Sequence, residues 1–259
     1  MYDLKYKKEK NIVAKTIKDY CNYIENMWKV DKPDDELYIY IFKSDLKYIY
    51  YAFPVFQKIL IYTILFPYWF FRIRKSWSKM RTFYQYWNGK YHILLRPIES
   101  YKKLDSSLGE LMLIKEEDRK KKFEITFFHI IHSIYINDLQ LPKWFKHGLV
   151  YLTTEKYFKK RIIKNSSIET FAVNFSDFKR YDVQKSDISI VYEYLKGYWT
   201  VKYLEDKTSI DLLKEIVFEN IKDDQDLLEL VKSKFDFLST SNSWSEIYEK
   251  VYNYFKTKL

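Results

Sequence analysis

Hydrophobic residues recur at helical spacing near the start of this chain. Between about Asn11 and Val30 they stand three or four positions apart, and the charged, proline-containing residues 31–35 end the pattern. We therefore predict a first helix that ends near Val30. Residues 37–42, LYIYIF, are aromatic and β-branched and predict a short strand, after which Ser44 or Asp45 is suited to cap a second helix.

Two stretches of strand-forming residues, 82–87 (TFYQYW) and 90–95 (KYHILL), flank Asn88 and Gly89. A two-residue type I′ turn needs positive φ at both central positions, which asparagine and glycine tolerate best. The sequence therefore predicts a β-hairpin here. We interpret His92, in its second strand, as a structural or surface histidine.

Residues 49–71 are almost continuously apolar and aromatic, with Gln57 and Lys58 as interruptions and the basic run 72–75 at the end. The uninterrupted part, residues 59–71, is shorter than the roughly 20 residues that span a bilayer, and it contains a proline. We interpret the stretch as a buried helix pair, with membrane insertion or seating at a membrane surface as the alternative. Candidate contacts with a membrane or a partner are Pro67, Trp69, Phe70 and Phe71.

The last third of the chain has amphipathic patterns typical of helices. They cover residues 186 or 187 to 195, ended by Gly197, and then 209–219, 224–235 and 243–256. The predicted fold class is α+β. A small N-terminal lobe, residues 1–122, has a mixed sheet, the hairpin and an apolar insertion at about 49–75. A mainly helical lobe, residues 123–259, completes one integrated unit with a cleft between the lobes.

Composition narrows the function only slightly. The 20% aromatic content and the four glycines among 259 residues fit the codon bias of an AT-rich genome, so we give them no functional weight. The formal charge of +10 favours anionic partners, but the lysines are spread along the chain, which makes a nucleic-acid partner unlikely. A single cysteine, Cys21, excludes an internal disulfide, and the N-terminus lacks a signal-peptide pattern, so a cytoplasmic location is expected.

Three of the four histidines lie within residues 123–152. His129 and His132 are three residues apart, and such residues share a face of a helix. A second helix starting near Pro142 would bring His147 back toward them. Three imidazoles gathered in this way are a ligand set for Zn²⁺ or another divalent ion.

The same region resembles a peptidase family. Residues 141–144, LPKW, are followed by FKHGLVYL, and residues 188–195, ISIVYEYL, are followed by Gly197. These motifs, with the terminal segment from Trp244 to Phe255, resemble gluzincin zinc peptidases of the peptidase MA-like group, which have a thermolysin-type catalytic lobe. In that family an H-E-x-x-H helix precedes an L-P-x-W turn and a helix beginning x-E-G-L-A-x-Y. The resemblance covers most of the chain except residues 49–71, and its framework residues are Phe128, Pro142, Trp144 and Gly148.

The residues that carry the family's chemistry differ here. With His132 on the second histidine of H-E-x-x-H, Phe128 falls on the first histidine and His129 on the general-base glutamate, while His147 replaces the ligand glutamate. The family mechanism needs three protein ligands and a glutamate that deprotonates the metal-bound water. Loss of that base slows such a reaction by about 10²- to 10⁴-fold.

No other residue suits these missing roles well. Glu124 is eight residues before His132, about 12 Å along a helix, and Asp138 lies in the turn. Lys185 replaces the tyrosine that the family often uses to stabilise an oxyanion, which leaves Tyr181, one turn away, as the catalytic candidate.

Two interpretations of the histidines stay open: a three-histidine site for Zn²⁺ or another divalent ion, or remnants in a filled cleft. The resemblance implies a pseudopeptidase that keeps its cleft for a peptide or protein partner. The alternatives are a noncanonical three-histidine metal-dependent peptidase or hydrolase, and a peripheral membrane or basic nucleic-acid-binding protein.

Overall fold

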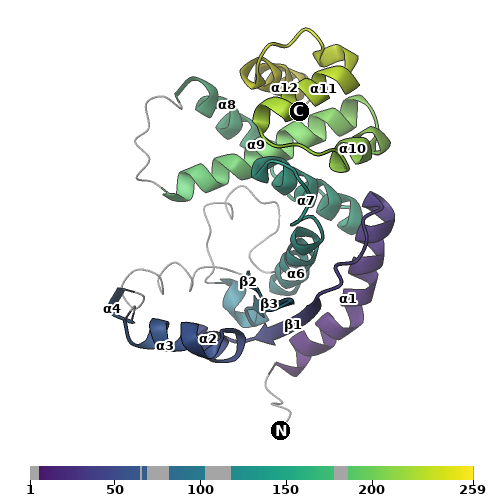
Figure 1. Ribbon diagram of the computed structural model, residues 1–259. Coiled ribbons are helices and arrows are strands. Elements are labelled where there is room, and N and C mark those ends of the chain that lie inside the picture. The colour runs from purple at the N-terminus through teal and green to yellow at the C-terminus, as the bar shows by residue number, and fades with distance from the viewer. Residues whose placement is uncertain (1–5, 65, 69–81, 103–117, 178–185, 259) are drawn as a thin grey trace. The chain divides into compact units, whose positions relative to one another are not determined.

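The computed structural model describes residues 6–64, 66–68, 82–102, 118–177 and 186–258. It is a mixed α+β chain, so the predicted class is confirmed (Figure 1). The first part contains α1 (Lys7–Trp28), β1 (Glu36–Ile41), α2 (Asp45–Ala52), α3 (Val55–Tyr62), α4 (Phe66–Tyr68), β2 (Thr82–Trp87), β3 (Lys90–Leu95) and the 3₁₀ helix η2 (Ile98–Lys102). The second part contains α6 (Arg119–Tyr135), α7 (Lys143–Phe158), α8 (Ser167–Asp177), α9 (Ser186–Lys207), α10 (Ile210–Val217), α11 (Asp224–Lys234), the 3₁₀ helix η4 (Asp236–Leu238) and α12 (Trp244–Lys258).

The described strands form a three-stranded mixed sheet in the order β1-β3-β2. β3 pairs in parallel with β1 and antiparallel with β2, and its residues from Tyr91 to Leu95 are all buried. Asn88 and Gly89 have φ values of 52° and 68°, as a turn of the predicted type requires. The predicted hairpin and first strand are confirmed.

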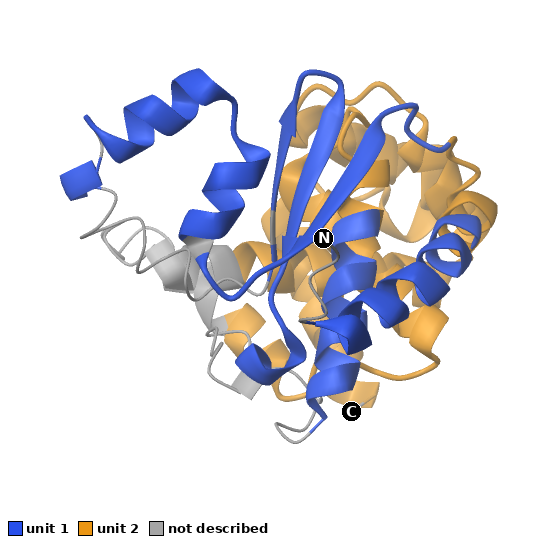
Figure 2. Cartoon of the chain, turned by 90° about the horizontal axis from the view of Figure 1, so that it is seen from below, with its two compact units in different colours: residues 1–22, 32–109, 114–131 blue, residues 23–31, 110–113, 132–259 orange. Residues whose placement is uncertain are grey.

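The chain divides into two compact units, coloured separately in Figure 2. Unit 1 contains residues 1–22, 32–109 and 114–131, and unit 2 contains residues 23–31, 110–113 and 132–259. The lobe boundary expected between residues 122 and 123 falls inside the continuous helix α6. In unit 1, Tyr20 of α1 packs its ring against Phe127 and Phe128 of α6, with ring centroids 5.5 and 5.1 Å apart.

The described part of the apolar insertion of unit 1 forms α2, α3 and α4; α2 and α3 are buried on one side only, and α4 has no buried residue. Tyr48 and Ala52 of α2 pack with Leu94 of β3, and Ile49 packs with Ile61 of α3. The expected helix pair is therefore present, but the prediction that it is buried is wrong for its outer side, where several aromatic and aliphatic side chains are exposed. In the described parts of the chain no helix is long and apolar enough to cross a membrane.

Unit 2 is organised around the crossing of α7 and α9, where two glycines meet. A Cβ placed on Gly197 would lie 1.9 Å from the carbonyl oxygen of Trp144, and one on Gly148 would lie 2.2 Å from the carbonyl oxygen of Gly197. The sequence predicted that Gly197 ends a helix, and this is wrong: α9 continues to Lys207. The missing side chain at Gly197 permits close approach of two helix backbones.

A buried carboxylate fixes the chain where it leaves α7. Lys159, at φ 47°, ends that helix, and the Glu155 side chain accepts hydrogen bonds from the backbone N–H groups of Ile162 (2.8 Å) and Ile163 (3.4 Å). It also accepts one from the Tyr198 hydroxyl of α9 (2.9 Å) and lies 3.4 Å from the Lys202 ammonium. A buried carboxylate is stable only with partners of this kind.

Candidate functional site

The structure places His129 and His132 on α6. His132 is fully buried in unit 2, where its ring stacks on the Trp28 indole with centroids 6.3 Å apart and planes 17° from parallel. The Trp28 indole N–H in turn donates to the Thr153 hydroxyl of α7 at 2.8 Å. His129 is partly buried. His132 therefore forms part of the core between the end of α1 and α7.

His147 lies on α7 and is also partly buried. Its ring contacts the Tyr194 ring of α9 edge-on, with centroids 4.3 Å apart. Burial, reinforced by the positive charges of Lys143 and Lys146, lowers the pKa of His147 to about 4. The imidazole is therefore neutral near pH 7, the form in which histidine can accept a hydrogen bond or ligate a metal.

A metal site needs its donors to converge. Among the described residues, no three histidine, cysteine, aspartate or glutamate side chains are grouped so that they could hold a metal ion. Zinc binding by His129, His132 and His147 stays a prediction, and we derive no reaction step from it. Tyr181, Lys185, Trp69, Phe70 and Phe71 lie outside the described residues, whereas Pro67 is exposed in α4.

The four predicted framework residues have structural positions. Phe128 is fully buried in unit 1 beside Tyr20. In unit 2, Pro142 is the N-cap of α7, and Gly148 is at the helix crossing. Trp144 is buried and lines a pocket of that unit. The L-P-x-W turn is thus part of a pocket wall, whereas the histidines contribute nothing to its lining.

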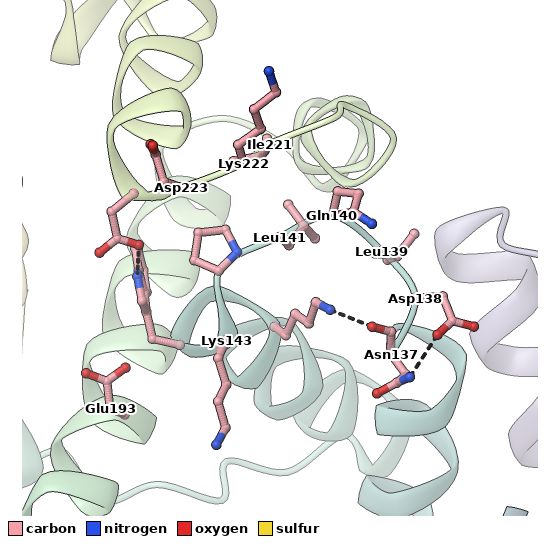
Figure 3. Close-up of a pocket in the computed structure, with 14 residues that line it drawn as sticks. Asn137, Asp138, Leu139, Gln140, Leu141, Lys143, Glu193, Ile221, Lys222 and Asp223 are labelled. Atoms are coloured by element: carbon pink, nitrogen blue, oxygen red, sulfur yellow. Dashed lines mark hydrogen bonds between the residues drawn. The ribbon is translucent and has the colours of Figure 1, made fainter. Parts of the chain in front are cut away.

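The pocket has a volume of about 680 Å³ and lies entirely in unit 2 (Figure 3). Three segments line it: the α6–α7 turn with the start of α7, one residue of α9, and the loop from α10 to α11. The turn and α7 contribute Asn137, Asp138, Leu139, Gln140, Leu141, Pro142, Lys143, Trp144 and Lys146; α9 contributes Glu193; the loop and α11 contribute Ile221, Lys222, Asp223 and Asp224.

One wall is fixed by the side chains of Trp144 and Asp224. The Trp144 indole N–H donates to Oδ1 of Asp224 at 2.9 Å, and the Lys196 ammonium lies 3.6 Å from Oδ2 of the same carboxylate. That ammonium also lies 4.4 Å from the centroid of the Trp144 ring, within cation–π range. The Asp224 carboxylate is therefore matched by both an N–H donor and a cation.

Hydrogen bonds also hold the rim. The Ile221 N–H donates to the Gln140 carbonyl at 3.2 Å, which joins the α10–α11 loop to the α6–α7 turn. The Lys146 ammonium donates to the Asn137 carbonyl at 2.6 Å. Asp223 caps α11 by accepting from the N–H groups of residues 225 and 226 at 2.8 and 2.9 Å. Most polar groups of the rim are thus already engaged within the protein.

Glu193 is different. It is partly buried, and among the described residues no hydrogen bond or ion pair holds its carboxylate. Burial raises its pKa, Asp224 adds to that increase, and Lys196 and Lys143 oppose it. Figure 3 shows Glu193 and Lys143 on the same side of the pocket. A carboxylate in this environment gains free energy when a cation or N–H donor from a ligand replaces its lost water.

Sequence reasoning did not single out Glu193 or residues 221–224. Glu193 lies within the motif that resembles the peptidase family, but its role there was not recognised. Asp223 before the amphipathic residues 224–235 is a helix-start signal, but such a signal says nothing of a contact with the α6–α7 turn. Only the tertiary structure brings the three segments together.

Comparisons with protein families, curated proteins and solved structures gave no match to this chain. The resemblance to gluzincins therefore rests on the residues quoted above and stays a prediction.

Proposed function

We propose that this protein binds a peptide, or a peptide-like segment of a partner protein, in the pocket of unit 2, without cleaving it. Glu193 carries the proposal, because it is the lining carboxylate that no hydrogen bond or ion pair holds among the described residues. The predicted pseudopeptidase role fits this proposal, since a gluzincin-like chain without the general base would keep binding and lose hydrolysis.

Burial is the main cause of the raised pKa of Glu193, so a cationic group is the part of the ligand that we expect to reach this carboxylate. Asp224, which already has partners, adds negative potential beside Glu193 and contributes to its raised pKa. A lysine or arginine side chain of the ligand would pair with Glu193 and lower that pKa again. A charge-assisted contact of this kind contributes about 1.5–3 kcal/mol.

The apolar part of the lining suits the aliphatic portion of the same ligand. Leu141, Pro142, Trp144 and Ile221 all contribute to it. Their positions are set by the α7 cap, the bond from Trp144 to Asp224 and the bond from Ile221 to Gln140. A pocket fixed in this way binds without a large ordering cost.

The test is a titration with two blocked peptide pools, identical except for lysine or norleucine at one fixed position. Binding is followed through the ¹⁵N-labelled indole N–H of Trp144, assigned by its loss in Trp144→Phe. We expect the lysine pool to shift this signal, and Glu193→Gln to weaken binding at least about 10-fold. The matched control is Glu249→Gln, an exposed carboxylate on α12.

Two outcomes would overturn the proposal. One is equal binding of both pools, or equal binding by wild type and Glu193→Gln. The other is cleavage of the pools, followed by mass spectrometry, that depends on added zinc and is lost in His132→Ala. The second result would favour the three-histidine hydrolase.

A further inference from the structure

The insertion in unit 1 exposes several large apolar and aromatic side chains to solvent. Phe56, Ile64 and Val55 are 75%, 73% and 70% exposed, values unusual for large apolar side chains. We call this surface the apolar face; its members are Tyr50, Tyr51, Val55, Phe56, Ile59, Ile64, Phe66 and Tyr68. Exposed apolar patches of this kind mark interaction sites.

Helices α2 and α3, which carry most of the apolar face, are anchored on their other side, whereas α4 has no buried residue. Tyr48 is fully buried, and its hydroxyl donates to the His92 carbonyl of β3 at 2.8 Å. Ile49, also fully buried, packs with Ile61. Figure 1 shows α2 next to the sheet, with α3 and then α4 following at increasing distance from it. The outward side chains are therefore held outward by the fold of unit 1.

The charge of this part of the chain has one sign. Lysines occur throughout the sequence, but residues 46–98 contain nine lysines and arginines and no aspartate or glutamate. This stretch therefore has a formal charge of +9, against +10 for the whole chain, although Lys90 is paired with Glu36 and Arg96 is buried. Of the described helices, α2 begins with Asp45 and carries the exposed Lys47, and the Lys58 ammonium of α3 lies 5.1 Å from the centroid of the Tyr50 ring.

We propose that the apolar face docks on the surface of a membrane that contains anionic phospholipids. Basic residues near such a surface strengthen attraction about fivefold each, and tyrosine and other aromatic residues favour the headgroup level. Helices α2 and α3 have eight residues each, about 12 Å in length, which suits helices that lie in the plane of the interface. A protein partner could also cover the apolar face, but it would not explain why residues 46–98 contain no acidic residue.

The experiment is co-sedimentation of the full chain with vesicles of phosphatidylcholine, with and without phosphatidylserine. We expect binding to the anionic vesicles that falls strongly at about 1 M salt, where the Debye length is about 3 Å. The double variant Phe56→Ser, Ile59→Ser should bind at least about 10-fold more weakly. Lys47→Glu should weaken binding to anionic vesicles by a smaller factor.

The matched control is Phe218→Ser, because Phe218 is 56% exposed and belongs to unit 2. It should bind like the wild type, and circular dichroism should show that all variants are folded. The proposal is overturned if the folded wild type does not sediment with anionic vesicles, or if the double variant binds as well as wild type. It is also overturned if the wild type forms a dimer in solution that the double variant loses, since the face would then be a protein interface. These results do not depend on Glu193, so the two proposals can fail separately.

Discussion

Helices α9 and α3 are both rich in large apolar side chains, yet they use them in opposite ways. In α9, Tyr198 and Trp199 are fully buried, whereas in α3 Phe56 and Ile59 are mostly exposed. α9 packs against α7, α8 and α12, and Gly197 lets its backbone touch that of α7. The comparison shows that the aromatic content of a helix does not determine whether its side chains are buried. Their burial depends on how closely the backbones of neighbouring helices approach.

The strongest test of this contrast is a methyl group at the helix crossing. Gly197→Ala would place a Cβ 1.9 Å from the carbonyl oxygen of Trp144. Because this oxygen belongs to the backbone of α7, a change of side-chain rotamer cannot relieve the clash. We expect it to lower the free energy of unfolding by at least about 4 kcal/mol, measured by denaturant titration. Gly89→Ala is the matched control: its φ of 68° is strained for alanine, but the space is open, so the loss should be about 1 kcal/mol. Equal effects would contradict the close approach of α7 and α9.

A somewhat smaller effect is expected for His132→Ala. This side chain is fully buried against Trp28, so its removal leaves a cavity that costs about 3 kcal/mol of unfolding free energy. If packing is its main role, a chelator should leave the melting temperature of the wild type unchanged. A wild type destabilised by the chelator and restored by zinc would instead support the three-histidine site.

The burial of His147 predicts a pH dependence of stability. Its pKa is 6.5 when exposed and about 4 in the folded chain, so the unfolded chain binds the proton more tightly. This contribution to stability is complete above about pH 6.5 and is lost as the pH falls toward 4, by at most about 3 kcal/mol. Urea titrations at several pH values measure it. The same titrations on His147→Gln should lack this component, and an unchanged profile would contradict the assignment.

The smallest effect should come from the exposed side of α3. Phe56→Ser combined with Ile59→Ser removes side chains that contact mainly water, so the free energy of unfolding should stay within about 0.5 kcal/mol of wild type. Ile49→Ser, on the buried side of the neighbouring helix α2, should cost about 3 kcal/mol. Comparable losses, measured by thermal or urea unfolding, would mean that the apolar face is part of the core.

Local patterns in the sequence predicted the elements well. Asn88 and Gly89 determine their hairpin through their own φ preferences, and Ser209 and Asp223 cap α10 and α11 close to the expected starts. Gly197 was misinterpreted because glycine ends helices and also permits close crossings, and the choice depends on a neighbour 49 positions away at Gly148. A local pattern does not contain that information.

The candidate site was less predictable than the fold. The histidine spacing was visible in the sequence, but whether the side chains converge depends on how α6 and α7 are joined. The pocket combines Trp144 with Asp224 and Glu193, which are far apart along the chain. The apolar face is exposed because Tyr48 and Ile49 are buried on the other side of the insertion. These are consequences of tertiary packing.

Glu155 has a further consequence for the motions of unit 2. Its carboxylate accepts hydrogen bonds from the N–H groups of Ile162 and Ile163 and from the hydroxyl of Tyr198. If the segment between α7 and α8, residues 159–166, moved away, this buried carboxylate would lose the two N–H donors, which is unfavourable. This segment contains no long helix or strand, yet the amides of Ile162 and Ile163 should exchange with deuterium as slowly as those inside α7 and α9. The irregular segment and the two crossed helices should therefore open as a single cooperative unit.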